Sequence, residues 1–206
     1  MYTFPSDWKA QPPKHVIEVV EKYAKQYDVD PKLILAQIYL ESRYDPFARS
    51  TAGAVGIMQL MPRTFYAAAR ALDFQVPNIF SIEQNIAAGV YELSKWIKHF
   101  SGLGYPEEEA QKLGLAAYNY GIGNLRRILS RQKRDKRNYA GIEHKLPQET
   151  REYVSRISDI KEKIREIPDT LSSSPESLTK SFAQPVSTRV KLNPFWIINN
   201  IVKKKP

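Results

Sequence analysis

The stretch of sequence that decides the fold is Glu41-Ser42-Arg43-Tyr44-Asp45-Pro46. The ten residues before it, 31–40, are apolar on most sides of a helix, which is typical of a helix buried in a core. Pro46 disfavours helical geometry at Asp45, so the helix ends close to that point. The sequence therefore predicts a buried helix over about 31–43, with Glu41 in its last turn.

Glu41 is the first candidate for a catalytic residue. Burial beside apolar side chains disfavours the charged form of a carboxyl and raises its pKa. A carboxyl that stays protonated near neutral pH is suited to protonating a glycosidic oxygen. A carboxylate near the negative end of a helix dipole is also unfavourable, which suggests a specific reason for this position. From position alone a second interpretation stays open, in which Glu41 faces solvent at the helix end.

The remaining helices follow from periodic apolar residues and helix-start signals. Asp30-Pro31 is typical of an N-cap followed by a first-turn proline, and Ser81 with Gln84 suggests a capping box. The predicted helices cover about 13–27, 31–43, 64–74, 81–100, a segment from 106, 125–132 and 147–166. No stretch of useful length alternates like a strand. We therefore predict an all-α domain over residues 1–166.

Residues 167–206 differ in composition from this body. Serines and prolines punctuate the segment after Ile167, which is typical of a linker. It closes with the apolar run 195–198 and the lysines 203–205. We expect an irregular tail that docks on another protein or on a membrane surface; an unstructured end is the alternative.

Overall composition limits the function classes. The formal net charge is +9, which favours an anionic partner, and the absence of cysteine excludes disulfides and thiol chemistry. Residues 1–13 lack the apolar run of a secretory signal, and no stretch approaches a membrane span. A basic cluster, defined here as the seven residues Arg126, Arg127, Arg131, Lys133, Arg134, Lys136 and Arg137, is either a solvated surface or an attractant for anionic wall polymer or phospholipid. It lacks interleaved aromatic residues, so nucleic acid is an unlikely partner.

Three further stretches accompany Glu41. Ser50 begins Ser50-Thr51-Ala52-Gly53-Ala54-Val55-Gly56-Ile57-Met58-Gln59-Leu60-Met61-Pro62, and later come Ala116-Ala117-Tyr118-Asn119-Tyr120-Gly121 and Glu149-Thr150-Arg151-Glu152-Tyr153-Val154. In this order and spacing they resemble the catalytic domain of soluble lytic transglycosylases (the SLT domain) in the lysozyme-like superfamily, over roughly residues 16–160. The resemblance implies a goose-type lysozyme-like helical fold with a groove for peptidoglycan glycan strands, and no cofactor or metal ion.

The resemblance also implies roles for single residues. Glu41 matches the family's one catalytic glutamate, and Tyr118 matches a tyrosine that hydrogen-bonds near the catalytic carboxyl. Substrate-binding positions are expected at Ser50, Gln59, Met61, Tyr118, Asn119 and Glu149. Each has a simpler interpretation: Gln59 and Asn119 as loop caps, Tyr118 as a core phenol, and Met58 or Met61 as core filler.

A single carboxyl fits a lytic transglycosylase. Asp45 is expected to organise the turn, so Glu41 has no obvious partner before Glu149. The resemblance implies that Glu41 protonates the β-1,4 bond between N-acetylmuramic acid and N-acetylglucosamine and then deprotonates the muramoyl C6 hydroxyl, giving a 1,6-anhydro end.

The alternatives are a hydrolysing muramidase and a non-catalytic peptidoglycan-binding or assembly subunit. Action at the cell wall is expected in either catalytic case. The enzyme would arrive there as a phage virion component, through a secretion system or as a mature periplasmic protein.

Overall fold

The computed structural model describes residues 2–6 and 8–166; the predicted linker and tail over 167–206 lie outside the described residues. The described chain is mostly helical, which confirms the predicted all-α class. In chain order it forms β1 (Tyr2–Thr3), α1 (Lys14–Tyr27), α2 (Pro31–Ser42), α3 (Pro62–Ala71), α4 (Ile82–Gly102), α5 (Glu107–Tyr120), α6 (Ile122–Ser130), η1 (Arg134–Lys136), α7 (Tyr139–Ile142), η2 (Glu143–Lys145), α8 (Gln148–Lys163) and β2 (Arg165–Glu166).

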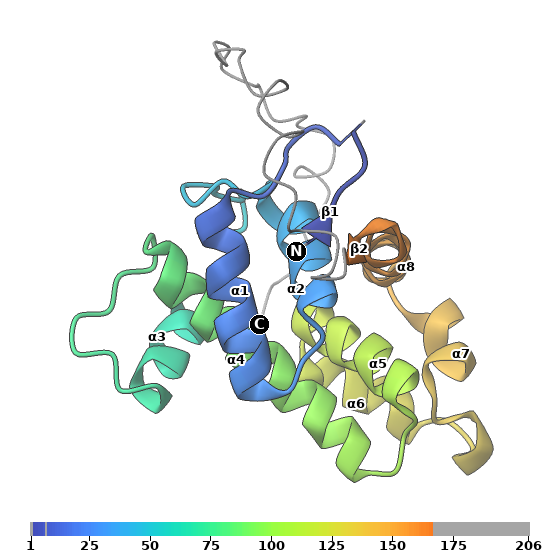
Figure 1. The fold of residues 1–206 in the computed structure, drawn as a ribbon. Coiled ribbons are helices and arrows are strands. Elements are labelled where there is room, and N and C mark those ends of the chain that lie inside the picture. Colours follow the sequence, from blue (N-terminus) through green and yellow to red (C-terminus); the bar gives the residue numbers. More distant parts are fainter. Residues whose placement is uncertain (1, 7, 167–206) are drawn as a thin grey trace.

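Helix α2 lies in the middle of the molecule, between α1 on one side and α8 on the other (Figure 1). The long helix α4 packs against α1, α3 and α5, and α5 in turn packs against α6 and α8. Six consecutive residues of α2, from Leu33 to Ile38, are buried, so the prediction of a buried helix is correct. A helix buried on nearly all sides holds its last turn in a fixed place, and that turn carries Glu41.

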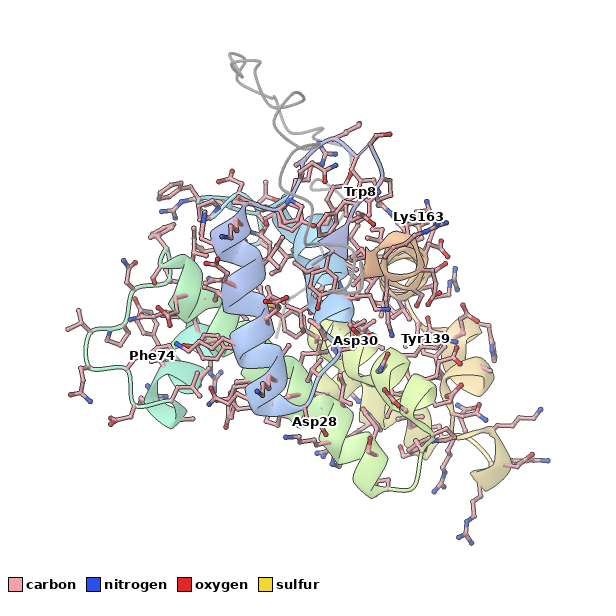
Figure 2. All side chains as sticks on the ribbon, viewed as in Figure 1. Trp8, Asp28, Asp30, Phe74, Tyr139 and Lys163 are labelled. Atoms are coloured by element: carbon pink, nitrogen blue, oxygen red, sulfur yellow. The ribbon has the colours of Figure 1, made fainter. Side chains whose placement is uncertain are left out.

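The start of α2 follows the sequence signal closely. The Asp30 carboxylate, at the α1–α2 junction in Figure 2, accepts a hydrogen bond from the backbone N–H of Lys32 at 2.8 Å. Pro31 occupies the first turn, where its missing N–H costs nothing. At the other end, Arg43 and Tyr44 both take positive φ angles of 54° and 67°, which turn the chain sharply out of the helix directly after Glu41.

Several predicted boundaries are wrong by a few residues. Helix α3 begins at Pro62 rather than at Thr64, because a proline fits the first helical turn well. Helix α6 begins at Ile122 rather than at Leu125, since Gly121 is both the C-cap of α5 and the N-cap of α6. Helix α7 was not expected.

The last predicted helix also ends early. Helix α8 stops at Lys163, and β2 pairs antiparallel with β1, with Tyr2 opposite Glu166 and Thr3 opposite Arg165. Two-residue strands show no alternation, which is why the sequence did not reveal them. In the part of the chain that the structure describes, no helix is long and apolar enough to cross a membrane.

Candidate functional site

The carboxyl of Glu41 receives a strong hydrogen bond from α8. The Tyr153 hydroxyl donates to Glu41 Oε1 at 2.7 Å, and the Tyr153 ring is only 1% exposed. Glu41 itself is partly buried, and its other oxygen, Oε2, has no hydrogen bond to a described residue. One oxygen of the carboxyl is therefore held by the protein, while the other keeps its hydrogen-bonding capacity.

The Tyr153 hydroxyl has a second partner on α2. The side-chain N–H of Gln37 donates to the Tyr153 oxygen at 3.0 Å. Gln37 lies four residues before Glu41, so both side chains project from the same face of α2 towards α8. The result is a linear chain of three side chains: Gln37, Tyr153 and Glu41.

The surroundings of Glu41 favour its neutral form. Desolvation by burial raises the pKa of Glu41 from 4.5 to about 8, the Tyr153 hydrogen bond lowers it, and the charge of Glu149 raises it. Glu149 lies four residues before Tyr153 on α8, so both face α2. This direction agrees with the prediction of a protonated carboxyl, and the partial burial of Glu41 contradicts the alternative in which it faces solvent freely.

Tyr118, at the end of α5, has a structural partner. Its hydroxyl donates to the backbone oxygen of Met58 at 2.9 Å, while burial and the nearby charges of Glu41 and Glu92 raise the pKa of its phenol. The phenol that donates to Glu41 is Tyr153. Tyr118 therefore lies close enough to Glu41 to feel its charge and ties the loop 43–61 to α5.

The loop 43–61 is fixed to the helices by buried polar side chains. The Ser42 hydroxyl donates to the backbone oxygen of Ile57 at 2.7 Å. Asn85 of α4 accepts from the Met58 N–H at 2.9 Å and donates to the backbone oxygens of Val55 and Ile79 at 3.2 and 2.8 Å. These contacts set the position of the loop next to the end of α2.

Glycines let this loop approach α4. At Gly56, whose φ is +85°, a Cβ atom would overlap the Asn85 amide. Gly89 of α4 leaves room for the Met58 thioether, which is completely buried, so the expectation of Met58 as core filler is correct.

Three predicted binding residues lie on the same loop. The Ser50 hydroxyl accepts from the Ala54 N–H at 2.9 Å, and the Gln59 amide donates to the backbone oxygens of Ala48 and Gly56 at 3.1 and 2.9 Å. Met61 is 44% exposed, which argues against core filler. Ser50 and Gln59 shape the loop, whereas Met61 presents an apolar surface to solvent.

Asn119 and Asp45 also have partners within the protein. The Thr150 hydroxyl donates to Asn119 Oδ1 at 2.8 Å, which links the Tyr118 motif to the Glu149 motif. Asp45 accepts from the Phe47 N–H at 2.8 Å and is exposed, so it organises the turn as expected.

An open cavity of about 820 Å³ lies elsewhere. It is lined by the end of α4, the start of α5, α6 and the segment after α6, and none of the seven predicted site residues borders it. Three arginines of the basic cluster, Arg126, Arg134 and Arg137, are among its lining residues, and all are exposed. Part of the basic cluster therefore lines a separate hollow.

Four residues of the site carried no predicted role. Tyr153 was visible in the third motif, and its spacing of four from Glu149 on one helix was the available signal. Gln37 shows the same spacing from Glu41. Thr150 belongs to the same motif as Tyr153, but its partner Asn119 is distant in sequence. Asn85 also acts through distant partners, and no local pattern marks it.

The comparisons with known proteins agree with this arrangement. The model of the transglycosylase SLT domain family matches residues 18–140. The membrane-bound lytic murein transglycosylase F of Desulfosudis oleivorans is 35% identical over 132 residues, which cover 63% of this chain and 28% of that protein. The membrane-bound lytic murein transglycosylase C of Actinobacillus pleuropneumoniae is 30% identical over 128 residues, covering 59% of this chain and 35% of that protein.

Among solved structures, an inactive glutamate-to-glutamine mutant of the lytic transglycosylase Slt from Pseudomonas aeruginosa superposes with a TM-score of 0.60. It is 27% identical, and the match covers 70% of this chain and 23% of that one. This similarity confirms the lysozyme-like fold predicted from the motifs. The chain spans only about a quarter to a third of the length of these relatives. Because the family model covers more than half of its residues, the chain belongs to the transglycosylase SLT domain family.

Proposed function

We propose that this protein is a peptidoglycan lytic transglycosylase, which cleaves the bond between N-acetylmuramic acid and N-acetylglucosamine and leaves a 1,6-anhydro end. The observation that carries the proposal is the state of Glu41: its carboxyl has a pKa raised to about 8, is held at one oxygen by Tyr153 and is free at the other. The relatives named lytic murein transglycosylases support the same reaction class.

The proposed mechanism uses Glu41 twice. A carboxyl with a pKa near 8 is protonated at neutral pH and donates its proton to the glycosidic oxygen as the C1–O bond breaks. The resulting carboxylate accepts the proton of the muramoyl C6 hydroxyl while that oxygen bonds to C1. The Tyr153 O–H stabilises the carboxylate between the two steps, because hydrogen bonds to ionised acceptors are stronger than neutral ones.

The other predicted residues take two kinds of role in this proposal. Met61 lines the sugar-binding surface with its exposed side chain, and Glu149 borders it and keeps the pKa of Glu41 high. Ser50 and Gln59 hold the loop and offer their remaining hydrogen-bonding capacity to the glycan. Asn119 and Tyr118 hold α8 and the loop 43–61 in place around Glu41.

The test is cleavage of purified sacculi by the Glu41→Gln variant. We expect release of soluble muropeptides with 1,6-anhydro ends by the wild type and a rate at least about 1,000-fold lower for Glu41→Gln, because glutamine donates no acid proton. The matched control is Glu18→Gln, which changes an exposed glutamate on α1 and should cleave normally. Substantial cleavage by Glu41→Gln would remove Glu41 from the catalytic role.

Hydrolysis is the second candidate function, and one observation favours it. Glu149 is near enough for its charge to raise the pKa of Glu41, and a pair of carboxyls is what a hydrolysing muramidase uses. Mass spectrometry separates the two reactions, since hydrolysis gives reducing ends that are 18 Da heavier than anhydro ends. Reducing ends that disappear in Glu149→Gln would assign the base to Glu149 and replace the transglycosylase proposal.

A non-catalytic peptidoglycan-binding subunit would bind sacculi and release nothing, and the same assay identifies it. We propose the bacterial cell wall as the place of action, in line with the murein transglycosylases among the relatives. Delivery as a virion component or through a secretion system, and docking through the tail, stay predictions. A neighbouring cluster of phage tail genes would support the first route.

A further inference from the structure

Gln37 is an unusual residue for its position. It is completely buried in α2, its N–H donates to the Tyr153 oxygen at 3.0 Å, and its own Oε1 is buried with no hydrogen-bond partner in the described structure. A buried carbonyl oxygen without a partner is destabilising, and an apolar side chain of the same size would avoid that cost. Such a local conflict is expected where a side chain serves a function.

We propose that Gln37 is a positioning residue for the reaction proposed above: it fixes the direction of the hydrogen-bond chain, so that Tyr153 always donates to Glu41 Oε1 and the acid proton of Glu41 stays on Oε2. This inference rests on the proposed function for its purpose and on the three side chains for its geometry.

The direction follows from the inventory of donors and acceptors. The Gln37 Nε2 atom has only protons to give, so the Tyr153 oxygen accepts from it. The single hydroxyl proton of Tyr153 then points to its other neighbour, Glu41 Oε1, at 2.7 Å. A proton on Oε1 that pointed towards Tyr153 would clash with this hydroxyl proton. The carboxyl proton is therefore placed on Oε2, the oxygen without a protein partner.

Without Gln37 the hydrogen-bond chain loses its fixed direction. The Tyr153 hydroxyl could then rotate and accept a proton from Oε1, which would hold the catalytic proton inside the protein. It would also be a weaker donor to the carboxylate, because hydrogen bonds in a chain polarise one another. The other ionisable groups around Glu41 are unchanged by this substitution: Glu149 on α8, Tyr118 on α5, and Glu92, which pairs with Lys95 on α4.

The experiment measures the ionisation of Glu41 directly. Carbon-13 NMR of the glutamate carboxyls gives the Glu41 titration midpoint, with the resonance assigned by its loss in Glu41→Gln. We expect Gln37→Met, which keeps the length and removes the donor, to raise the midpoint by about half a pH unit. Gln37→Leu replaces it if the methionine variant does not fold. Ile38→Val, a buried change one residue away, is the control and should leave the midpoint unchanged.

A double-mutant cycle with Tyr153→Phe tests whether Gln37 acts through Tyr153. We expect Gln37→Met to have no further effect on the midpoint in the Tyr153→Phe background. On sacculi it should lower the maximal rate about 3- to 10-fold with little change in the half-saturating substrate concentration, since the change affects proton placement rather than binding.

An unchanged midpoint in Gln37→Met, or an equal change with and without the Tyr153 hydroxyl, would overturn the inference. An inactive wild type would instead refute the proposed function, while the NMR titration would still decide whether Gln37 directs the chain.

Discussion

The raised pKa of Glu41 makes a quantitative prediction about stability. An acid whose pKa is 4.5 in the unfolded chain and about 8 in the folded protein binds its proton more tightly when folded. Glu41 therefore destabilises the fold increasingly as the pH rises from 4.5 to 8, and no further above that. Relative to pH 4, the expected loss in the free energy of unfolding is about 3 kcal/mol at pH 7 and about 5 kcal/mol at pH 9.

The Glu41→Gln variant removes this pH-dependent loss of stability, since glutamine keeps an acceptor for the Tyr153 hydroxyl and has no charge. We expect the variant to be more stable than the wild type at pH 9, and the difference between them to shrink as the pH falls to 4. Urea unfolding curves of both proteins at several pH values give this difference, and the titration of all other groups cancels from it. Such a gain in stability with a loss of activity is typical of a catalytic group held in a strained setting.

The same comparison with Glu18→Gln, at an exposed position on α1, provides the control. A difference between Glu41→Gln and wild type that stays constant from pH 4 to pH 9 would refute the reasoning. It would mean that Glu41 titrates near its ordinary pKa, and the acid role would lose its physical basis.

Three further predictions concern neighbouring features. Tyr153→Phe removes the hydrogen-bond donor that lowers the pKa of Glu41. The alkaline limb of the pH–activity profile should therefore move to higher pH, and the rate should fall about 10- to 100-fold. An alkaline limb at the same pH as in the wild type would contradict this prediction. Gly56→Ala should destabilise the fold by about 3 kcal/mol in urea unfolding, because it places a Cβ at positive φ against the Asn85 amide. Gly123→Ala is the control: a Cβ there meets open space, so the free energy of unfolding should fall far less. Replacing the arginines of the basic cluster with glutamine should weaken sacculus binding at low salt and reduce its salt dependence; identical salt dependence in a sedimentation assay would mark the cluster as a solvated surface.

The sequence predicted the parts of this fold that depend on local signals. Asp30-Pro31 marked the start of α2 and Ser81 the start of α4, because capping is a contact between residues two or three positions apart. The capping box was only half correct: Ser81 accepts from the Gln84 N–H, but the Gln84 side chain accepts from Asn78 instead of returning to Ser81. The packing of a preceding loop decided that detail, and no local pattern could reveal it.

The candidate site shows the same limit. Glu41 was predicted from the apolar helix around it, and its buried environment agrees with that prediction. The partners of its carboxyl depend on how α2 and α8 pack, since 112 residues separate Tyr153 from Glu41. Gln37 is a single polar residue in an apolar run, and the sequence alone does not distinguish a buried amide with a function from a polar position facing solvent.

The pairing of β1 with β2 brings the first and last residues of the described helical body next to each other. Tyr2 and Glu166 lie opposite each other, so the polypeptide enters and leaves the helical body at one point (Figure 1). A unit closed in this way can be grafted into a surface loop of another protein without stretching either junction.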